Sequence, residues 1–277
     1  MTRQVRLHES RPRAARLLCL ALILTSGLAL AAPPTTGRLI WQDEFDGPAG
    51  QSPADDKWVF DQGTDWGNSQ LEWDTDLPTN VSLDGEGHLA ITASEQEYQG
   101  QPYTSGRIKT KGLFEHSYGR FEARIKLPVG QGIWPAFWML GHDIESVPWP
   151  ACGEIDIMEY RGHAPGVLWG SVHGPGHAGS KAVSTRYELP TGGFQQDFHV
   201  FAIEWGPESI DWFVDGRLYK TVTPEDLPAG AQWVYDHPFF ILLNVAVGGG
   251  WAGAPDTATT FPQTMLVDYV RVYGARK

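Results

Sequence analysis

Apolar and polar residues alternate with a period of two along much of the chain. In residues 120–127 every odd position is apolar and every even position is charged, the pattern of a strand with one buried face. Residues 210–214 and 217–222 flank Asp215-Gly216, a two-residue turn that favours a β-hairpin. Further strands are predicted at residues 89–93, 200–205, 239–247 and 267–273.

Helical periodicity is nearly absent, and we expect a single helical turn at residues 224–227. The chain contains 32 Gly and 20 Pro, residue types that form the turns between short strands. Short strands separated by turns are typical of an antiparallel β-sandwich or jelly roll. The fold class predicted for the chain is therefore all-β, in one domain.

The N-terminal segment has a different pattern. Five arginines precede residues 17–30, which are almost wholly apolar, and Ala29-Leu30-Ala31 then matches a small-x-small cleavage site. A membrane anchor is the alternative, but this run of about 14 residues is shorter than the ~20 that span a bilayer. The sequence predicts a signal peptide at 1–31, a linker at 32–38 and the folded domain at 39–277.

The charge balance argues against electrostatic binding to nucleic acid. The chain has 21 basic and 33 acidic residues, for a formal net charge of −12. Cleavage near Ala31 would remove five Arg and Glu9, leaving 16 basic and 32 acidic residues and a charge of −16. We expect an acidic protein that is secreted to the extracellular or periplasmic space, without membrane association after cleavage.

Only one cysteine, Cys152, would remain after cleavage, so no internal disulfide is expected. A lone cysteine is a candidate nucleophile. Its alternative role is that of a small buried residue, which burial statistics favour strongly.

The candidate chemistry lies in residues 153–160, where Glu154, Asp156 and Glu159 alternate with apolar residues. Glu154 and Asp156 are two apart and share a strand face. Glu159 would fall on the opposite face, unless a one-residue bulge at Ile157-Met158 returns it to the acidic one. With that bulge, three carboxylates converge on one surface and raise one another's pKa.

An exposed strand face and a metal site are the alternative interpretations of this cluster. Exposed strands usually alternate acids with Thr, Lys or Ser, and calcium sites prefer loop oxygens. The third interpretation is a general acid/base pair with a helper. Retaining glycoside hydrolysis uses two carboxyl groups ~5–5.5 Å apart, one ionised and one protonated.

Together with the apolar run at 134–140, the spacing Glu154-x-Asp156-x-x-Glu159 resembles family 16 of the glycoside hydrolases. The resemblance extends from residues 41–45 to 268–273. It is strongest to the laminarinase-type endo-β-1,3-glucanases of that family. The resemblance implies a curved jelly roll with a concave sugar-binding cleft. No cofactor is expected for catalysis, and a monomer is expected as the default state of a secreted depolymerase.

The family pattern implies that Glu154 is the nucleophile, Glu159 the acid/base and Asp156 the assisting carboxylate. Family lichenases lack the inserted residue near Met158, whereas laminarinases have it, which favours β-1,3-glucan as the substrate. Family agarases and carrageenases share the insertion, so another polysaccharide, including mixed-linkage β-glucan, is one alternative. A β-glucan-binding protein without catalysis is the other, although such relatives typically lose the acids.

Three tryptophans are candidate sugar-binding residues. Trp134 and Trp138 are four apart and share a strand face, and flat indole rings stack on pyranose rings. Trp251 follows three glycines and matches an aromatic residue at the cleft edge of the family. Four other tryptophans are assigned to the core, namely Trp41, Trp58, Trp205 and Trp212.

Weaker polar candidates come from the resemblance alone. Asn68 and Arg107 match family positions that bind sugar hydroxyls, and His173 matches a histidine near the scissile bond. A structural histidine is the alternative for His173. A zinc site formed by His173 and His177 is disfavoured, because Gly-Pro-Gly between them prevents a helix and no third ligand is evident.

The family also implies a structural Ca²⁺ ion away from the chemistry. Its ligands here would be Glu44, Gly87 and Asp268. Asp268 could instead be an ordinary acid at a sheet edge. A bound ion would stabilise a domain that lacks disulfides.

Overall fold

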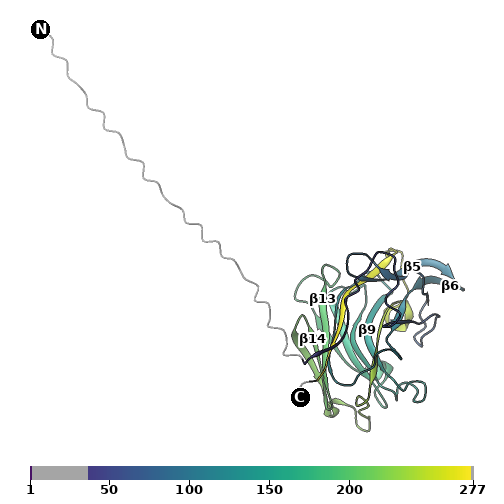
Figure 1. Ribbon diagram of the computed structural model, residues 1–277, viewed down its shortest axis with the longest axis vertical. Coiled ribbons are helices and arrows are strands. Elements are labelled where there is room, and N and C mark those ends of the chain that lie inside the picture. The colour runs from purple at the N-terminus through teal and green to yellow at the C-terminus, as the bar shows by residue number, and fades with distance from the viewer. Residues whose placement is uncertain (2–36, 276–277) are drawn as a thin grey trace. The chain divides into compact units, whose positions relative to one another are not determined.

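The computed structural model describes Met1 and residues 37–275. The strands between residues 39 and 273 form two facing β-sheets (Figure 1). The first sheet contains β1 (Leu39–Asp43), β3 (Glu72–Asp74), β4 (Val81–Leu83), β5 (Leu89–Tyr98), β6 (Gln101–Ser105), β8 (Gly119–Lys126), β13 (His199–Gly206), β14 (Ser209–Val214), β15 (Arg217–Val222) and β17 (Gln263–Tyr273). The second contains β2 (Val59–Phe60), β7 (Arg107–Lys109), β9 (Ile133–Gly141), β10 (Glu154–Tyr160), β11 (Val167–His173), β12 (Val183–Glu188) and β16 (Phe239–Val247).

Helices are short and few in the described residues. They are the 3₁₀ helices η1 (Gly179–Lys181) and η2 (Pro224–Asp226) and the α-helix α1 (Gly249–Ala252). Across residues 37–275, no helix has the length and apolar character needed to cross a membrane. The predicted signal peptide, and the predicted linker up to residue 36, lie outside the described residues.

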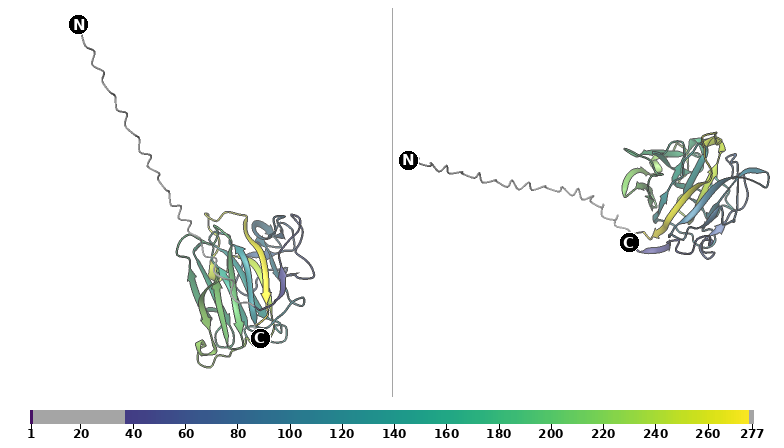
Figure 2. Two further views of the ribbon diagram at one scale, coloured as in Figure 1. Left: turned by 60° about the vertical axis from the view of Figure 1, so that its left-hand side comes forward. Right: turned by 90° about the horizontal axis from the view of Figure 1, so that it is seen from above.

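The all-β sandwich is confirmed. The first sheet runs in the order β15-β14-β13-β8-β17-β5-β6-β3, and the second in the order β12-β11-β10-β9-β16-β7-β2. Neighbouring strands are antiparallel except β3 and β6, which run parallel. In Figure 2 the yellow strand β17 lies within the first sheet, where it pairs with β5, β8 and β1 from distant parts of the sequence.

Each predicted strand overlaps an observed one, although β5 and β17 extend beyond their predicted bounds. The predicted run 239–247 coincides with β16, and every residue of β16 is buried. The hairpin of β14 and β15 turns at Asp215 and Gly216, whose φ angles are 50° and 75°. These positive angles are those of the turn type that this dipeptide favours. The predicted helical turn corresponds to η2.

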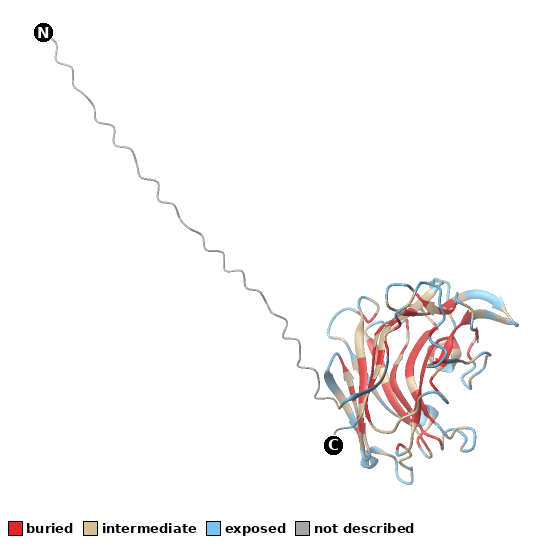
Figure 3. Cartoon of the chain, in the orientation of Figure 1, coloured by how far each residue is buried: buried red, intermediate tan, exposed pale blue. Residues whose placement is uncertain are grey.

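The hydrophobic core fills the space between the two sheets. In Figure 3 the buried residues, coloured red, lie mainly along the strands. Trp58, Trp205 and Trp212 are almost fully buried there, and Trp41 packs against them from a half-buried position. The assignment of these four tryptophans to the core is confirmed. Aromatic and branched side chains that face inward from both sheets therefore make up most of the core.

The strand β8 differs from the simple alternation that its sequence predicts. Its even positions Arg120 and Glu122 are also buried, with 3% and 8% of their surface exposed. The Arg120 Nε atom donates to a Glu122 carboxylate oxygen at 2.7 Å, and the guanidinium group covers the Phe213 ring. Paired charges and the neighbouring strands bury the outer face of β8. The alternation of apolar and charged residues alone does not reveal this burial.

Candidate active site

The three acids of β10 lie together on the face of the second sheet that is turned away from the core. Between Asp156 and Glu159 the pairing of β10 with both β9 and β11 slips by one residue. Ile157 and Met158 are therefore both buried in the core, and Glu159 returns to the face of Glu154 and Asp156. The predicted bulge is confirmed.

Burial and neighbouring charges raise the pKa of two of these acids, Glu159 and Asp156. Burial, followed by the charges of Asp156 and Glu154, raises the pKa of Glu159 well above its usual value. Burial and the charge of Glu154 likewise raise the pKa of Asp156. A carboxyl group that keeps its proton at neutral pH can act as a general acid.

Glu154 has a partner that the sequence did not reveal. The Trp149 Nε1–H donates to Glu154 Oε2 at 2.6 Å, and the Trp149 side chain is among the exposed large hydrophobic groups, at 45%. Trp149 belongs to the loop between β9 and β10, where no periodic pattern indicates a direction for the side chain. Its position five residues before Glu154 was the only signal available.

His173 lies beside the acids, at the end of β11. Its Nδ1 accepts the Gly179 N–H at 3.1 Å, so the neutral ring carries its proton on Nε2. That Nε2 is 3.1 Å from Asp156 Oδ2 and 3.9 Å from Glu154 Oε1. His173 therefore lies at the acid cluster, and its role there stays a prediction.

The predicted tryptophans lie on the same face but have different surroundings. The Trp134 Nε1–H donates to Glu159 Oε1 at 3.2 Å, and Trp134 is only 9% exposed because Trp251 packs against it. Trp138 is more exposed, and its Nε1–H donates to Asn244 Oδ1 at 2.8 Å. Trp251 lies in the short helix α1.

Two residues near Trp251 were missed by the sequence analysis. Trp169 is paired with Glu159 across β10 and β11, and its ring centroid is 5.0 Å from that of Trp251. The Arg161 guanidinium lies over both rings, at 4.5 Å from Trp169 and 4.9 Å from Trp251. An aromatic group with a cation therefore borders Glu159.

Arg107 and Asn68 lie toward the other side of the tryptophans. The Arg107 guanidinium is held between the Trp66 and Trp138 rings, at 4.6 and 4.9 Å from their centroids, and its Nε donates to Asp61 at 3.0 Å. Asn68 is exposed, and its backbone carbonyl accepts the Gly250 N–H at 2.9 Å. The segments that carry Asn68 and Trp251 are thus joined.

A buried pair of acids supports these two segments and was also missed. Glu72 accepts the Val247 N–H at 2.8 Å, and Asp74 accepts the Trp66 Nε1–H at 2.7 Å. Burial, followed by the charge of Asp74, raises the pKa of Glu72 to about 8, and burial raises the pKa of Asp74 to about 7. The short strand β3 gave no periodic signal for burial of its acids.

This pair predicts a pH dependence of stability. The folded state binds protons that the unfolded chain releases above its ordinary carboxyl pKa of 4.5, so the free energy of unfolding should fall as pH rises to about 8. Each group contributes at most about 1.4 kcal/mol per pH unit. In urea unfolding between pH 5 and 8, Glu72→Gln should flatten this fall, whereas the exposed control Glu97→Gln should not. Equal slopes for Glu72→Gln and the wild type would contradict the assignment.

The proposed calcium ligands are paired with arginines. Both oxygens of Glu44 accept hydrogen bonds from Arg271, at 2.8 and 2.7 Å, and Asp268 pairs with Arg124. Gly87 lies in the turn before β5, with a φ of 89°. As arranged, the two carboxylates neutralise guanidinium groups and do not fit a cation. Calcium binding stays a prediction that requires both ion pairs to open.

Neither remaining candidate, His177 nor Cys152, gains support as a reactive group. His177 is fully buried, and its Nε2 lies 2.7 Å from the Tyr235 hydroxyl, so it contributes to the core. Cys152 is buried, and desolvation with the charges of Asp143 and Glu154 raises its pKa to about 11. A thiol with that pKa is not ionised at neutral pH.

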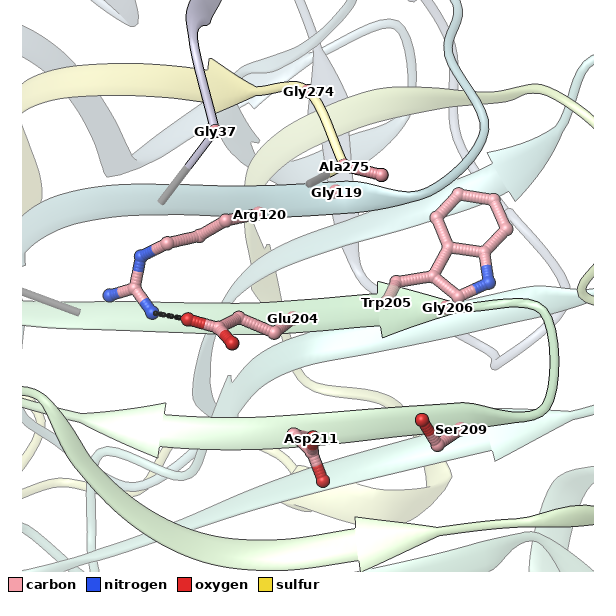
Figure 4. Close-up of a pocket in the computed structure, with 10 residues that line it drawn as sticks. All are labelled: Gly37, Gly119, Arg120, Glu204, Trp205, Gly206, Ser209, Asp211, Gly274 and Ala275. Carbon is pink, nitrogen blue, oxygen red and sulfur yellow. Dashed lines mark hydrogen bonds and ion pairs between the residues drawn. The ribbon is translucent and has the colours of Figure 1, made fainter. Parts of the chain in front are cut away.

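A hollow of about 350 Å³ lies on the first sheet, away from the acids of β10 (Figure 4). Arg120 and Glu204 face each other in it, with Arg120 Nη1 donating to Glu204 Oε1 at 3.3 Å, and glycines form much of its wall. No residue predicted for the site lines it. The chemistry of the acid cluster, rather than the depth of a hollow, therefore identifies the candidate site.

Comparison with known proteins agrees with this geometry. A beta-glucanase of Rhodothermus marinus is 42% identical over 246 residues, which cover 85% of this chain and 85% of that protein. The laminarinase catalytic domain of Thermotoga maritima is 44% identical, with a TM-score of 0.82 over 87% of this chain and 100% of that one. The endo-beta-1,3-glucanase of Pyrococcus furiosus is 48% identical, with a TM-score of 0.81 over 86% and 94%.

The family assignment follows from the match to a sequence profile. The profile described as glycosyl hydrolases family 16 matches residues 64–271, which include the acid cluster of β10 and the tryptophans of β9. The same span contains most strands of both sheets. The chain belongs to family 16 of the glycosyl hydrolases.

Proposed function

We propose that this protein hydrolyses internal β-1,3 linkages of a laminarin-like β-glucan with retention of configuration. The observation that carries the proposal is the bulged strand β10, which gathers Glu154, Asp156 and Glu159 on one face. The names of similar proteins support the substrate class, since they include a beta-glucanase and endo-β-1,3-glucanases.

In the first step Glu154 attacks the anomeric carbon, and Glu159 gives its proton to the departing glycosidic oxygen. The C–O bond to the leaving sugar breaks, and a glycosyl ester forms on Glu154. The raised pKa of Glu159 supports this role, because burial and the charge of Glu154 help it keep the proton until it is needed. Glu159 then removes a proton from water, which attacks the ester and releases the sugar.

The residues around the pair act through position and charge. Trp149 donates to Glu154 Oε2, which leaves Glu154 Oε1 as the oxygen for attack. Trp134 donates to Glu159 Oε1 and orients that carboxyl group. Asp156 lies between them with a raised pKa, so we assign it the role of holding a proton that limits repulsion within the cluster.

Sugar units would lie along the outer face of the second sheet, on either side of the acids. Trp138 and Trp251 offer indole surface for stacking, because both are half-buried and lie near the cluster. Arg107 and Asn68 offer polar groups for sugar hydroxyls, and His173 stands next to Asp156. This distribution supports a chain-like substrate that contacts several strands.

We further propose that the protein is exported and acts as a monomer. The support for export is the arginine-rich, then apolar, N-terminal sequence with a small-x-small site ending at Ala31. N-terminal sequencing of the secreted protein is expected to find a start near Ala32. Secretion of a protein that still begins at Met1 would contradict the cleavage.

Incubation with a panel of polysaccharides tests the function. The panel contains laminarin, mixed-linkage β-glucan, agar and carrageenan. New reducing ends should appear fastest with laminarin, as oligosaccharides with β-1,3 linkages. Binding to laminarin without new reducing ends would favour a non-catalytic binding protein, and release from agar or carrageenan alone would favour the other hydrolases.

A further inference from the structure

A second group of metal-ligating side chains lies outside the proposed catalytic cluster. His142 and Asp143 directly follow β9, and His237 precedes β16. One ligand atom from each of these three residues lies within 4.8 Å of the others. The backbone holds the two segments together, since the His142 N–H donates to the Pro238 carbonyl at 3.0 Å.

The donor atoms of this group are incompletely satisfied. Asp143 Oδ1 is buried and accepts no hydrogen bond. His237 Nε2 lies 3.3 Å from that oxygen, but it forms its hydrogen bond with the Cys152 carbonyl, at 3.1 Å. The His142 and His237 ring centroids are 5.7 Å apart. A buried carboxylate oxygen without a donor, next to two imidazoles, is costly unless a cation binds there.

The second nitrogen of His237 also has a suitable partner. His237 Nδ1 lies 3.4 Å from an Asp236 carboxylate oxygen, so the ring stands between Asp143 on one side and Asp236 on the other. Metal-binding histidines commonly donate their free ring N–H to a carboxylate, which fixes the tautomer that binds the metal. The arrangement at His237 matches that pattern.

We propose that His142, Asp143 and His237 bind a divalent transition metal of the Zn²⁺ class. Two imidazole nitrogens and one carboxylate oxygen are ligands that Zn²⁺ prefers, with water completing a four-coordinate site. On binding, His237 changes to the tautomer that carries its proton on Nδ1. The Nδ1–H then donates a hydrogen bond to Asp236. Nε2 then turns from the Cys152 carbonyl to the metal.

The metal would have a structural role near the acids and take no part in hydrolysis. His142 and Asp143 begin the loop that carries Trp149, and this loop ends at Gly153, next to Glu154. A bound ion would fasten the start of the loop to the segment before β16. We therefore expect it to stabilise the folded protein, because an ion that binds only the folded state raises its stability.

Calorimetric titration of the untagged protein with ZnCl₂, after treatment with EDTA and its removal, tests the proposal. We expect saturable binding of one ion, with the unfolding temperature rising when Zn²⁺ is added. His237→Gln and His142→Gln should each weaken binding at least tenfold and abolish that rise. The exposed control His163→Gln should bind like the wild type.

One further variant separates this site from the catalytic cluster, where Glu154, Asp156 and His173 also lie close together. Glu154→Gln should keep zinc binding, whereas loss of binding in that variant would assign the ion to the catalytic cluster and overturn the proposal. Absence of saturable binding to the wild type, or undiminished binding by the double variant His142→Gln/His237→Gln, would overturn it as well. Unfolding temperatures without zinc check that every variant folds.

Discussion

Replacement of Glu154 by Gln is expected to lower kcat on laminarin by about 10⁴-fold or more, because the amide cannot form the glycosyl ester. The fold should survive, since Gln has nearly the same size and its oxygen can still accept the Trp149 N–H. The measurement is the release of reducing ends, with unfolding temperature as the check on folding. Glu97→Gln, on the exposed part of β5, is the matched control.

The Glu154→Gln variant should also bind substrate. Laminari-oligosaccharides should bind with affinity close to that of the wild type, because the stacking surface and the polar groups around the acids are unchanged. A folded Glu154→Gln variant that turns over laminarin at the wild-type rate would remove Glu154 from the mechanism.

Replacement of Glu159 by Ala is the second change with a large expected effect. Removal of a general acid typically costs 10²–10⁴-fold, so we expect a loss on the order of 10³-fold on laminarin. The loss should be much smaller for an aryl glycoside with an acidic phenol, because such a leaving group departs without a proton. Comparison of kcat/KM for the two substrates measures this difference.

Added azide separates an acid/base role from a structural one in the same variant. Azide needs no general base, so it should attack the glycosyl ester on Glu154 and give a β-glycosyl azide, with faster turnover of the aryl glycoside. If Glu159→Ala lost activity equally on both substrates and did not respond to azide, Glu159 would instead have a structural role, such as holding Trp134.

The sequence predicted the elements whose signals are local. The strand β16 is a continuous apolar run with clear ends, and every one of its residues is buried. The bulge in β10 was predictable because three acids at offsets of two and five share a face only if one residue is extra. The Asp215-Gly216 turn was predictable because few other dipeptides accept two positive φ angles.

Contacts made by side chains of irregular loops were not predictable. Trp149 reaches Glu154 from an irregular loop, and Trp66 reaches Asp74 because its loop folds back on β3 through the bridge between Gly63 and Asp74, which no local pattern encodes. β5 continues to Tyr98, five residues beyond its predicted end, because pairing with β6 and not burial holds its polar half.

The candidate site shows the same division. Its acids and the Trp134–Trp138 pair belong to strands, and their shared face follows from spacing. The roles within that face depend on tertiary contacts: Trp134 is covered by Trp251 and donates to Glu159, whereas Trp138 is more exposed. Spacing alone assigned both tryptophans the same stacking role.

The most direct test of the central claim, that Glu154 and Glu159 form a retaining pair, is proton NMR of the anomeric region during the first minutes of laminarin hydrolysis. A retaining mechanism releases the β-anomer first, and the α-anomer grows in later by mutarotation. The arrangement on β10 predicts this order. Initial release of the α-anomer would contradict it, because inversion forms no ester on Glu154.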